Sequence, residues 1–146
     1  MTAPCSDRSP SVSEYVFVYG SLRRAAQHPM HRVLKHYAQY VDPACMQGYL
    51  YAVADYPGAV ASSAPHAKVY GEVYQVLQPD LLFTALDAYE ECSAAFAQPH
   101  EYSRQQLAVT LATGTRIMAW VYVYNRAVSD FRLIAGGDYL NAIQVE

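Results

Sequence analysis

The chain has 146 residues, of which 53% are hydrophobic and 14 are tyrosines, and its formal net charge is −3. This length suits one domain with a proper core, and the apolar content excludes a disordered chain. The sequence has no basic cluster beyond Arg23-Arg24, so neither a nucleic acid nor an anionic membrane is an expected partner.

The sequence also indicates where the domain begins and in which compartment the protein is expected. Residues 1–14 are polar and lack the apolar stretch of a signal peptide, so we expect a flexible tail before a single domain over residues 15–146. The longest apolar run, Ile117 to Tyr124, is too short to span a bilayer as a helix. Three widely spaced cysteines without a CxxC pair fit a reducing compartment, and the expected location is cytoplasmic.

The first half of the chain predicts a strand, a helix and further strand material. The segment EYVFVYG is a short apolar strand that ends at Gly20. The segment HPMHRVLKHYAQY has apolar residues at helix spacing, with Pro29 near the start. Strand-forming residues surround Gly48, and Pro57-Gly58 then predicts a turn.

The second half predicts a strand, a helix and a hairpin. The segment AKVYGEVYQVL alternates as a strand does, and Gly71 in its middle predicts a bulge or a close backbone approach. The clearest helix is QPDLLFTALDAYEEC, with Pro79 at its first position. A hairpin follows with Gly114 in its turn, and its second strand, apolar on both faces, is expected to be central. The elements predict an α+β domain with a closed or strongly curled sheet and helices outside it.

Two adjacent carboxylates end the second helix, and the helical period separates them. Glu91 falls on the polar face, where a solvated charge is the simplest interpretation. Glu90 falls at the edge of the apolar arc, where desolvation and the negative end of the helix dipole both raise the pKa of its carboxyl. A general base working near neutral pH needs such a shift, whereas a carboxylate at the core margin, paired with Arg104 for example, would need none.

The loop after the first strand reads Tyr19-Gly20-Ser21-Leu22. Glycine permits a close approach, and successive amides in such a turn can bind a carboxylate or an oxyanion. Many strand–Gly–Ser turns bind nothing, so this pattern alone is weak evidence for a site. A nucleophilic role for Ser21 would need a base that the sequence does not reveal.

Two other patterns are weaker still. His28 and His31 have HxxH spacing, but no third ligand is evident, so no metal site is predicted and surface histidines are the simpler interpretation. Cys92 has no identifiable histidine partner, so a structural thiol is favoured over a nucleophile.

Eight short motifs occur in an order that resembles one known family. They are FVYGSL, HRVL, YP, VYGEVYQV, LDAYEEC, EYSRQQLAV, AWVYVY and GGDYL, and they extend from about Tyr15 to Tyr139. Each motif is short, but their joint order and spacing resemble the γ-glutamylcyclotransferase-like family, which includes γ-glutamylamine cyclotransferases.

This resemblance implies a fold and an activity. The implied fold is a small mixed β-barrel of about six to seven strands flanked by a few helices. The implied activity is release of 5-oxoproline from a γ-glutamyl compound, with the Tyr19–Leu22 loop binding the glutamyl part and Glu90 accepting the proton. No cofactor is implied, the expected partner is a small γ-glutamyl substrate, and the expected state is a monomer or homodimer.

Two further residues and one loop concern the rest of the pocket. Tyr102 and Tyr124 are candidate substrate-binding residues, although aromatic packing between strands would explain both equally well. Many relatives have glycine where this chain has Glu91, and a second carboxylate would further disfavour ionisation of Glu90 and could disfavour anionic leaving groups. The Ser93–His100 loop is expected to shape the leaving-group side.

Two alternatives to an enzyme stay open at this stage. The same barrel and loop could form a non-catalytic module that binds a small carboxylate-bearing metabolite. A purely structural or interaction protein, whose tyrosines only pack, is the other.

Overall fold

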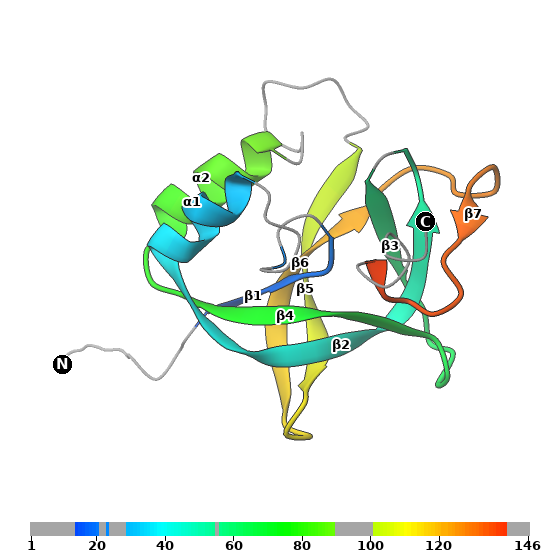
Figure 1. Ribbon diagram of the computed structural model, residues 1–146, viewed down its shortest axis with the longest axis horizontal. Helices are drawn as coiled ribbons and strands as arrows, with labels where there is room; N and C mark the ends of the chain where they lie inside the picture. The colour runs from blue at the N-terminus through cyan, green and yellow to red at the C-terminus, as the bar shows by residue number, and fades with distance from the viewer. Residues whose placement is uncertain (1–13, 21–22, 24–28, 55, 90–100, 140–146) are drawn as a thin grey trace, which may run out of the picture.

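The computed structural model describes residues 14–20, 23, 29–54, 56–89 and 101–139 (Figure 1). Within these ranges the elements follow in the order β1 (Tyr15–Val18), α1 (Met30–Tyr37), β2 (Ala38–Ala52), β3 (Pro57–Ala61), β4 (Lys68–Val76), α2 (Pro79–Tyr89), β5 (Tyr102–Leu111), β6 (Arg116–Tyr124) and β7 (Arg132–Leu133).

Five strands close into a barrel. The order β2-β4-β1-β6-β5 returns to its start because β2 also pairs with β5, while β3 and β7 pair with β2 as extra strands. The β1–β6 pair is parallel and the other pairs are antiparallel, so the sheet is mixed. The small mixed barrel predicted from the sequence is therefore confirmed. Strand β6 pairs on both sides, with β1 and with β5, as its apolar sequence predicted for a central strand.

The long strand β2 makes closure possible. Its 15 residues pair with β4, β3, β5 and β7, and its register against β4 shifts between Tyr40 and Asp42. Such an irregularity bends a strand and increases its twist, which a small barrel needs. Strand β2 begins at Ala38 directly after α1, earlier than the residues around Gly48 at which we predicted strand structure.

Buried side chains form one cluster on each face of the sheet. Phe17, Val73 and Val121 belong to the cluster that fills the barrel. Val16 and Val18, which alternate with Phe17 along β1, instead pack with residues of both helices. Alternation along the strands thus supplies both the barrel interior and the surface on which the helices lie.

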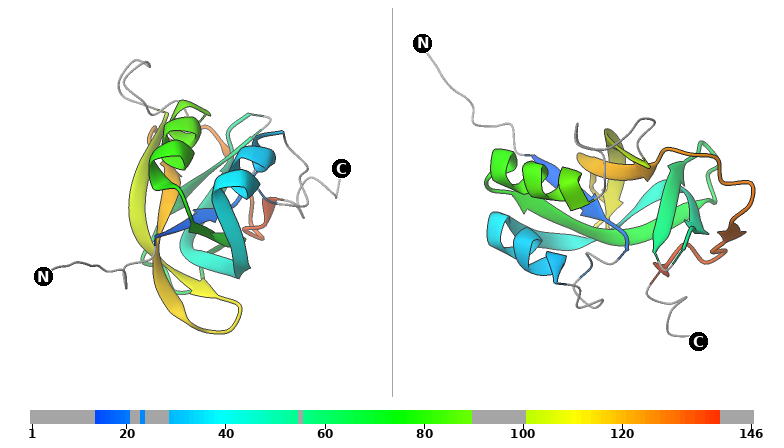
Figure 2. Two further views of the ribbon diagram at one scale, coloured as in Figure 1. Left: turned by 90° about the vertical axis from the view of Figure 1, so that its left-hand side faces the viewer. Right: turned by 90° about the horizontal axis from the view of Figure 1, so that it is seen from above.

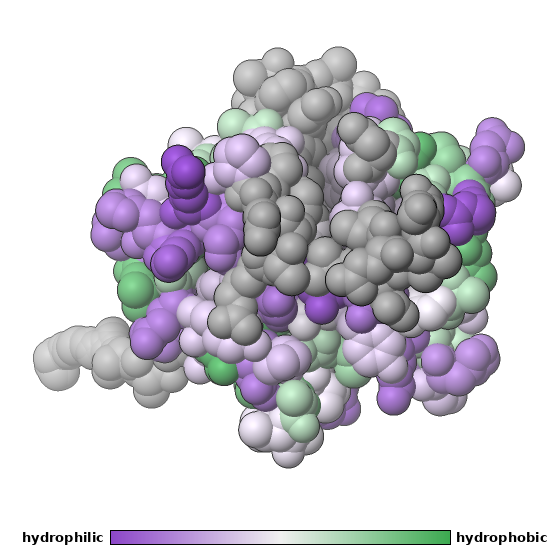
Figure 3. Space-filling model, in the orientation of Figure 1, coloured by the Kyte–Doolittle hydropathy of each residue, from purple (hydrophilic) through white to green (hydrophobic). Residues whose placement is uncertain are grey.

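Helices α1 and α2 lie side by side against one side of the barrel (Figures 1 and 2). Helix α2 begins at Pro79, whose missing N–H costs nothing at a first helical position. Hydrophilic side chains gather over the outward side of the two helices (Figure 3). No helix in the described ranges is long and apolar enough to cross a membrane.

Two glycine predictions had different outcomes. A Cβ added at Gly71 would lie 2.2 Å from the carbonyl oxygen of Val18, so the close backbone approach predicted there is confirmed. The turn predicted over ADYPGAV lies earlier than Pro57-Gly58: the N–H of Val53 donates to the Tyr56 carbonyl at 3.1 Å, and Pro57-Gly58, which we predicted within the turn, opens strand β3. Proline is tolerated at the first residue of a strand because it need not donate a ladder hydrogen bond there.

Candidate functional site

Tyr19 directly follows β1 and ties three strands together. Its side chain is buried, its hydroxyl donates to the carbonyl oxygen of Tyr122 at 2.7 Å, and it accepts from the backbone N–H of Ala59 at 3.1 Å. Tyr122 is on β6 and Ala59 on β3. The end of β1 is therefore fixed by two buried hydrogen bonds whose partners lie 103 and 40 residues away.

Gly20 begins a turn that Arg23 closes. The backbone N–H of Arg23 donates to the carbonyl oxygen of Gly20 at 3.1 Å. A Cβ at Gly20 would approach Pro57 Cγ to 2.9 Å, so a larger residue would press against the start of β3. Ser21 and Leu22, the other two residues of the predicted substrate loop, lie outside the described residues.

The two candidate pocket tyrosines lie beside the same Pro57-Gly58 pair. The hydroxyl of Tyr102 donates to the carbonyl oxygen of Pro57 at 2.6 Å, and a Cβ at Gly58 would lie 2.9 Å from the Tyr124 side chain. The two tyrosine rings meet edge to face with centroids 5.4 Å apart. The structure thus brings Gly20, Tyr102 and Tyr124 together around this dipeptide.

The burial of these tyrosines agrees with aromatic packing. Tyr102 is 5% exposed and Tyr124 is 8% exposed, and the Tyr124 ring also meets Phe131 at 5.8 Å. A role for either tyrosine in substrate binding stays a prediction. The sequence analysis missed Pro57-Gly58 as the point where the loop and the tyrosines meet, although the YP motif was a signal for it.

Helix α2 has the two faces that its period predicted. Leu82, Phe83 and Leu86 are buried, whereas Asp80 and Thr84 are exposed, and the Thr84 hydroxyl donates to the Asp80 carbonyl at 2.7 Å. The described helix ends at Tyr89. The predicted base Glu90, its neighbours Glu91 and Cys92, and residues 93–100 lie outside the described residues.

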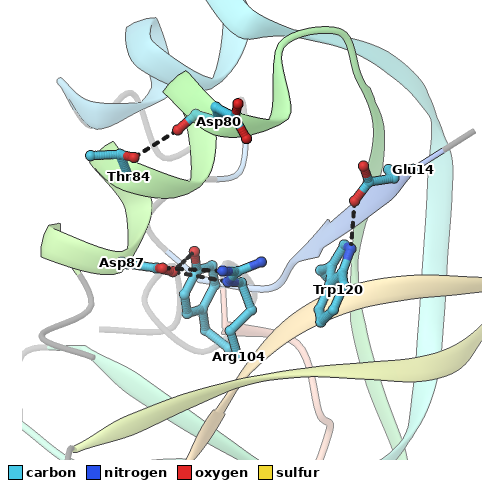
Figure 4. Close-up of polar contacts among 7 residues, drawn as sticks. Glu14, Asp80, Thr84, Asp87, Arg104 and Trp120 are labelled. Atoms are coloured by element: carbon cyan, nitrogen blue, oxygen red, sulfur yellow. Dashed lines mark hydrogen bonds and ion pairs between the residues drawn. The ribbon is translucent and has the colours of Figure 1, made fainter. Parts of the chain in front are cut away.

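Asp87, in the last turn of α2, is held from two strands. Its carboxylate accepts from Arg104 Nε at 3.0 Å and Nη2 at 3.2 Å, and from the Tyr122 hydroxyl at 2.6 Å (Figure 4). The guanidinium of Arg104 also lies over the Phe83 ring at 4.3 Å and the Trp120 ring at 5.0 Å. Such a bidentate, ring-stacked arginine fixes the carboxylate in one orientation.

Neither partner of Asp87 was evident from the sequence. The helical period puts Asp87 on the same polar face as Glu91, which predicts a solvated charge. The sequence suggested Arg104 only as a partner for Glu90. In the structure Arg104, on β5 and 17 positions after Asp87, makes its bidentate pair with Asp87. The available signal was the arginine that ends the EYSR motif.

Tyr122 connects the two parts of the candidate site. Its backbone oxygen accepts from Tyr19 at the end of β1, and its hydroxyl donates to Asp87 in the last turn of α2. The substrate loop was predicted to follow β1, and the base was predicted to follow Tyr89. The described residues that lead into these two features are therefore joined through one residue, Tyr122.

Glu101 is a carboxylate close to the Tyr102–Tyr124 pair. Its Oε2 accepts from the Tyr56 hydroxyl at 2.5 Å, and the Tyr56 and Tyr102 rings are 6.3 Å apart. Burial raises the pKa of Tyr124 above its ordinary value of 10.0, the negative charge of Glu101 raises it further, and Arg126 acts in the opposite direction. Tyr124 is therefore neutral across the physiological range.

The remaining candidates from the sequence bring little to this region. The His31 ring meets Tyr74 edge to face at 6.0 Å on the helix side of the sheet. The part of the chain that the structure describes contains no group of three His, Cys, Asp or Glu side chains able to hold a metal ion. His28 lies outside it.

The barrel places this chain in a known structural class. It superposes on the solved AIG2-like protein of Mus musculus with a TM-score of 0.68 and 24% sequence identity, covering 87% of this chain and 88% of that one. It also superposes on the solution structure of protein ytfP from Escherichia coli with a TM-score of 0.59 and 33% identity, covering 88% and 98% of the two chains. The fold is therefore that of the AIG2-like barrels.

Sequence comparison narrows the class to a family. The family model described as "Gamma-glutamyl cyclotransferase, AIG2-like" matches residues 16–141. The gamma-glutamylcyclotransferase family protein YtfP of Escherichia coli K12 is 34% identical over 127 residues, which are 86% of this chain and 96% of the relative. The chain belongs to the gamma-glutamyl cyclotransferase, AIG2-like family, and the resemblance carried by its motifs is confirmed.

Proposed function

We propose that this protein is a γ-glutamylcyclotransferase that converts a γ-glutamyl amine or γ-glutamyl amino acid into 5-oxoproline and the free amine. Family membership supports the reaction class. The observation that carries the assignment of residues is the path from Tyr19 through Tyr122 to Asp87. Through it, the strand that leads into the substrate loop and the helix that leads into Glu90 are held together.

The substrate itself supplies the nucleophile. The α-amino nitrogen attacks the γ-carbonyl carbon, a new C–N bond closes the five-membered lactam, and the original γ-amide C–N bond breaks. Because the attack is intramolecular, the effective concentration of the nucleophile is already high. The protein needs only to bend the substrate, take a proton from the α-ammonium and stabilise the oxyanion.

The backbone amides of the Tyr19–Leu22 loop bind the glutamyl part of the substrate. Gly20 allows the turn to begin in close contact with Pro57, whose Cγ would lie 2.9 Å from a Cβ at that position. Successive amides in a turn are suited to a carboxylate or to an oxyanion that develops during the attack. Tyr102 and Tyr124 complete the wall next to Pro57-Gly58.

Glu90 is the general base. In the sequence it follows Tyr89, the last described residue of α2, and lies three positions beyond the fixed Asp87. Arg104 is already engaged by Asp87, which favours a role for Glu90 other than a pair with that arginine. The α-nitrogen loses two protons as it becomes the lactam N–H, and Glu90 takes each in turn and passes it to the leaving nitrogen, which departs as an ammonium. Atoms and charge then balance without a metal, nucleotide or covalent enzyme intermediate.

A substrate screen tests the reaction. Purified protein is incubated separately with γ-glutamyl amino acids, γ-glutamyl-ε-lysine, other γ-glutamylamines and glutathione. Both 5-oxoproline and the released amine are measured, and the reaction should produce them in equal amounts. Turnover of at least one compound supports the proposal. Stabilisation of the protein against heat by a γ-glutamyl compound, with no product after long incubation, would instead identify a binding module.

A further inference from the structure

Arg23 ends the substrate loop with a side chain that reaches back to the barrel. Its Nη1 donates to Asp138 Oδ1 at 2.8 Å and toward the carbonyl oxygen of Tyr70 at 3.4 Å. Its Nε lies 3.9 Å from Glu72 Oε2 and has no hydrogen-bond partner among the described residues. The side chain is 13% exposed, so the cation sits largely out of solvent between two carboxylates.

The partner Asp138 belongs to a segment that is itself fixed. The N–H of Tyr70 donates to the Gly137 carbonyl at 2.8 Å, and the N–H of Ile134 donates to the Leu50 carbonyl at 2.7 Å. Gly137 has φ +70, and a Cβ there would lie 1.8 Å from the Lys68 carbonyl oxygen, so only glycine fits. Asp138 therefore belongs to an arm, residues 134–138, that is hydrogen-bonded to β2 and β4.

Glu72 makes the cation's surroundings more negative still. It is 7% exposed on β4, on the helix side of the sheet, and it accepts from the Tyr74 hydroxyl at 3.2 Å. The Arg23 side chain is 13% exposed and that of Asp138 is 32% exposed, so salt screens their ion pair less than a pair on the open surface. Arg23, which follows the loop, is thus held by two carboxylates.

We propose that Arg23 is a positioning residue, whose ion pair with Asp138 fixes the end of the turn that starts at Gly20 and thereby favours substrate binding. This inference rests on the proposed function, because it assigns the turn to the glutamyl moiety. The turn closes through the backbone of Arg23, and the side chain of the same residue ties it to the barrel. Because Arg23 is fixed before substrate arrives, less of the binding free energy is spent on ordering this residue.

The same geometry gives the late GGDYL motif a function. From the sequence, this motif contributed only to the family resemblance. In the structure, Gly137 allows the arm to touch β4 and Asp138 grips the arginine that follows the loop. Segments 115 residues apart thereby meet at the proposed substrate loop.

The test uses Asp138→Asn, with Asp130→Asn as control because Asp130 is exposed in the same part of the chain. A positioning role affects binding in the ground state and the transition state alike, so KM should rise about tenfold in Asp138→Asn while kcat changes less than about twofold. Asp138→Glu should restore much of the affinity. Arg23→Lys, which keeps the charge but loses the planar fork, should give an intermediate KM.

Hydrogen exchange of the free proteins separates this inference from the proposed function. The peptide that covers residues 19–24 should exchange faster in Asp138→Asn than in the wild type, and at the wild-type rate in Asp130→Asn. If the wild type turns over no γ-glutamyl compound, the proposed function fails, and the exchange rates still decide whether the ion pair holds the turn. Unchanged exchange and unchanged KM in a folded Asp138→Asn, or a loss confined to kcat, would overturn the inference.

Discussion

The hydroxyl of Tyr19 donates a 2.7 Å hydrogen bond to the carbonyl oxygen of Tyr122, in the interior of the protein. The bond joins the residue after β1 to β6, and the side chain of Tyr122 continues the connection to Asp87 on α2. A tyrosine that begins a substrate loop thus also fixes where that loop starts. The same residue therefore serves both the stability and the proposed chemistry of the site.

Tyr19→Phe should lower stability clearly. The change removes the donor to the Tyr122 carbonyl and the acceptor of the Ala59 N–H, and each buried group left unpaired costs about 1–3 kcal/mol. We expect the free energy of unfolding in urea to fall by about 2–4 kcal/mol. Tyr70→Phe, at a ring that is 41% exposed, is the control and should change it little. Equal stability of the two variants would show that the buried bonds contribute nothing.

Tyr122→Phe tests the connection between β6 and α2 without altering the backbone bond to Tyr19. Loss of the hydroxyl removes a hydrogen bond to a carboxylate and should cost about 1–2 kcal/mol of stability. Because Glu90 directly follows α2 in the sequence, a less well-held helix end should also lower kcat, by about tenfold. Tyr15→Phe on β1 serves as control. Unaltered kcat in Tyr122→Phe would mean that Asp87 and Arg104 alone orient this turn.

Gly71→Ala should be among the most damaging single changes in the barrel. The new methyl group would lie 2.2 Å from the Val18 carbonyl oxygen and 2.8 Å from the Phe17 ring, inside the β1–β4 pair. The expected loss is about 3 kcal/mol or more in urea unfolding. Gly136→Ala meets no atom within 4 Å and should change stability by less than about 0.5 kcal/mol.

Tyr124 predicts how stability changes at alkaline pH. Its pKa is raised in the folded protein, so the folded state keeps the phenol proton at a pH where the unfolded chain has lost it. Its contribution is fully present below the unfolded value of 10.0 and is lost as pH rises through the folded pKa. Urea unfolding at about pH 8 and about pH 11 should show a smaller decline in Tyr124→Phe than in the wild type. An equal decline in both would exclude this cause.

Much of the fold was predictable because it depends on local patterns. The alternation over Lys68–Val76 and the helical period over Pro79–Tyr89 specify one strand and one helix, and the glycine at position 114 marks the hairpin turn with φ +97. These signals need no knowledge of distant residues. The two apolar faces of β6 further indicated its central place between β1 and β5.

The rest of the fold depends on contacts between distant residues. Asp87 has the spacing of a solvent-exposed residue, and only the barrel brings Arg104 and Tyr122 to it. Pro57-Gly58 has the composition of a turn, yet pairing with the end of β2 makes it a strand. The arm that carries Asp138 could not be connected to Arg23 by any periodicity, because the ion pair spans most of the chain.

The central claim is that Glu90 transfers the proton during lactam formation, and the rate of 5-oxoproline release tests it most directly. In Glu90→Gln, kcat should fall by about 10²–10⁴ with little change in KM, while Glu91→Gln, one position along the same chain, should keep kcat within about tenfold of the wild type. Both variants should match the wild type in thermal unfolding. Full turnover by a folded Glu90→Gln would contradict the account.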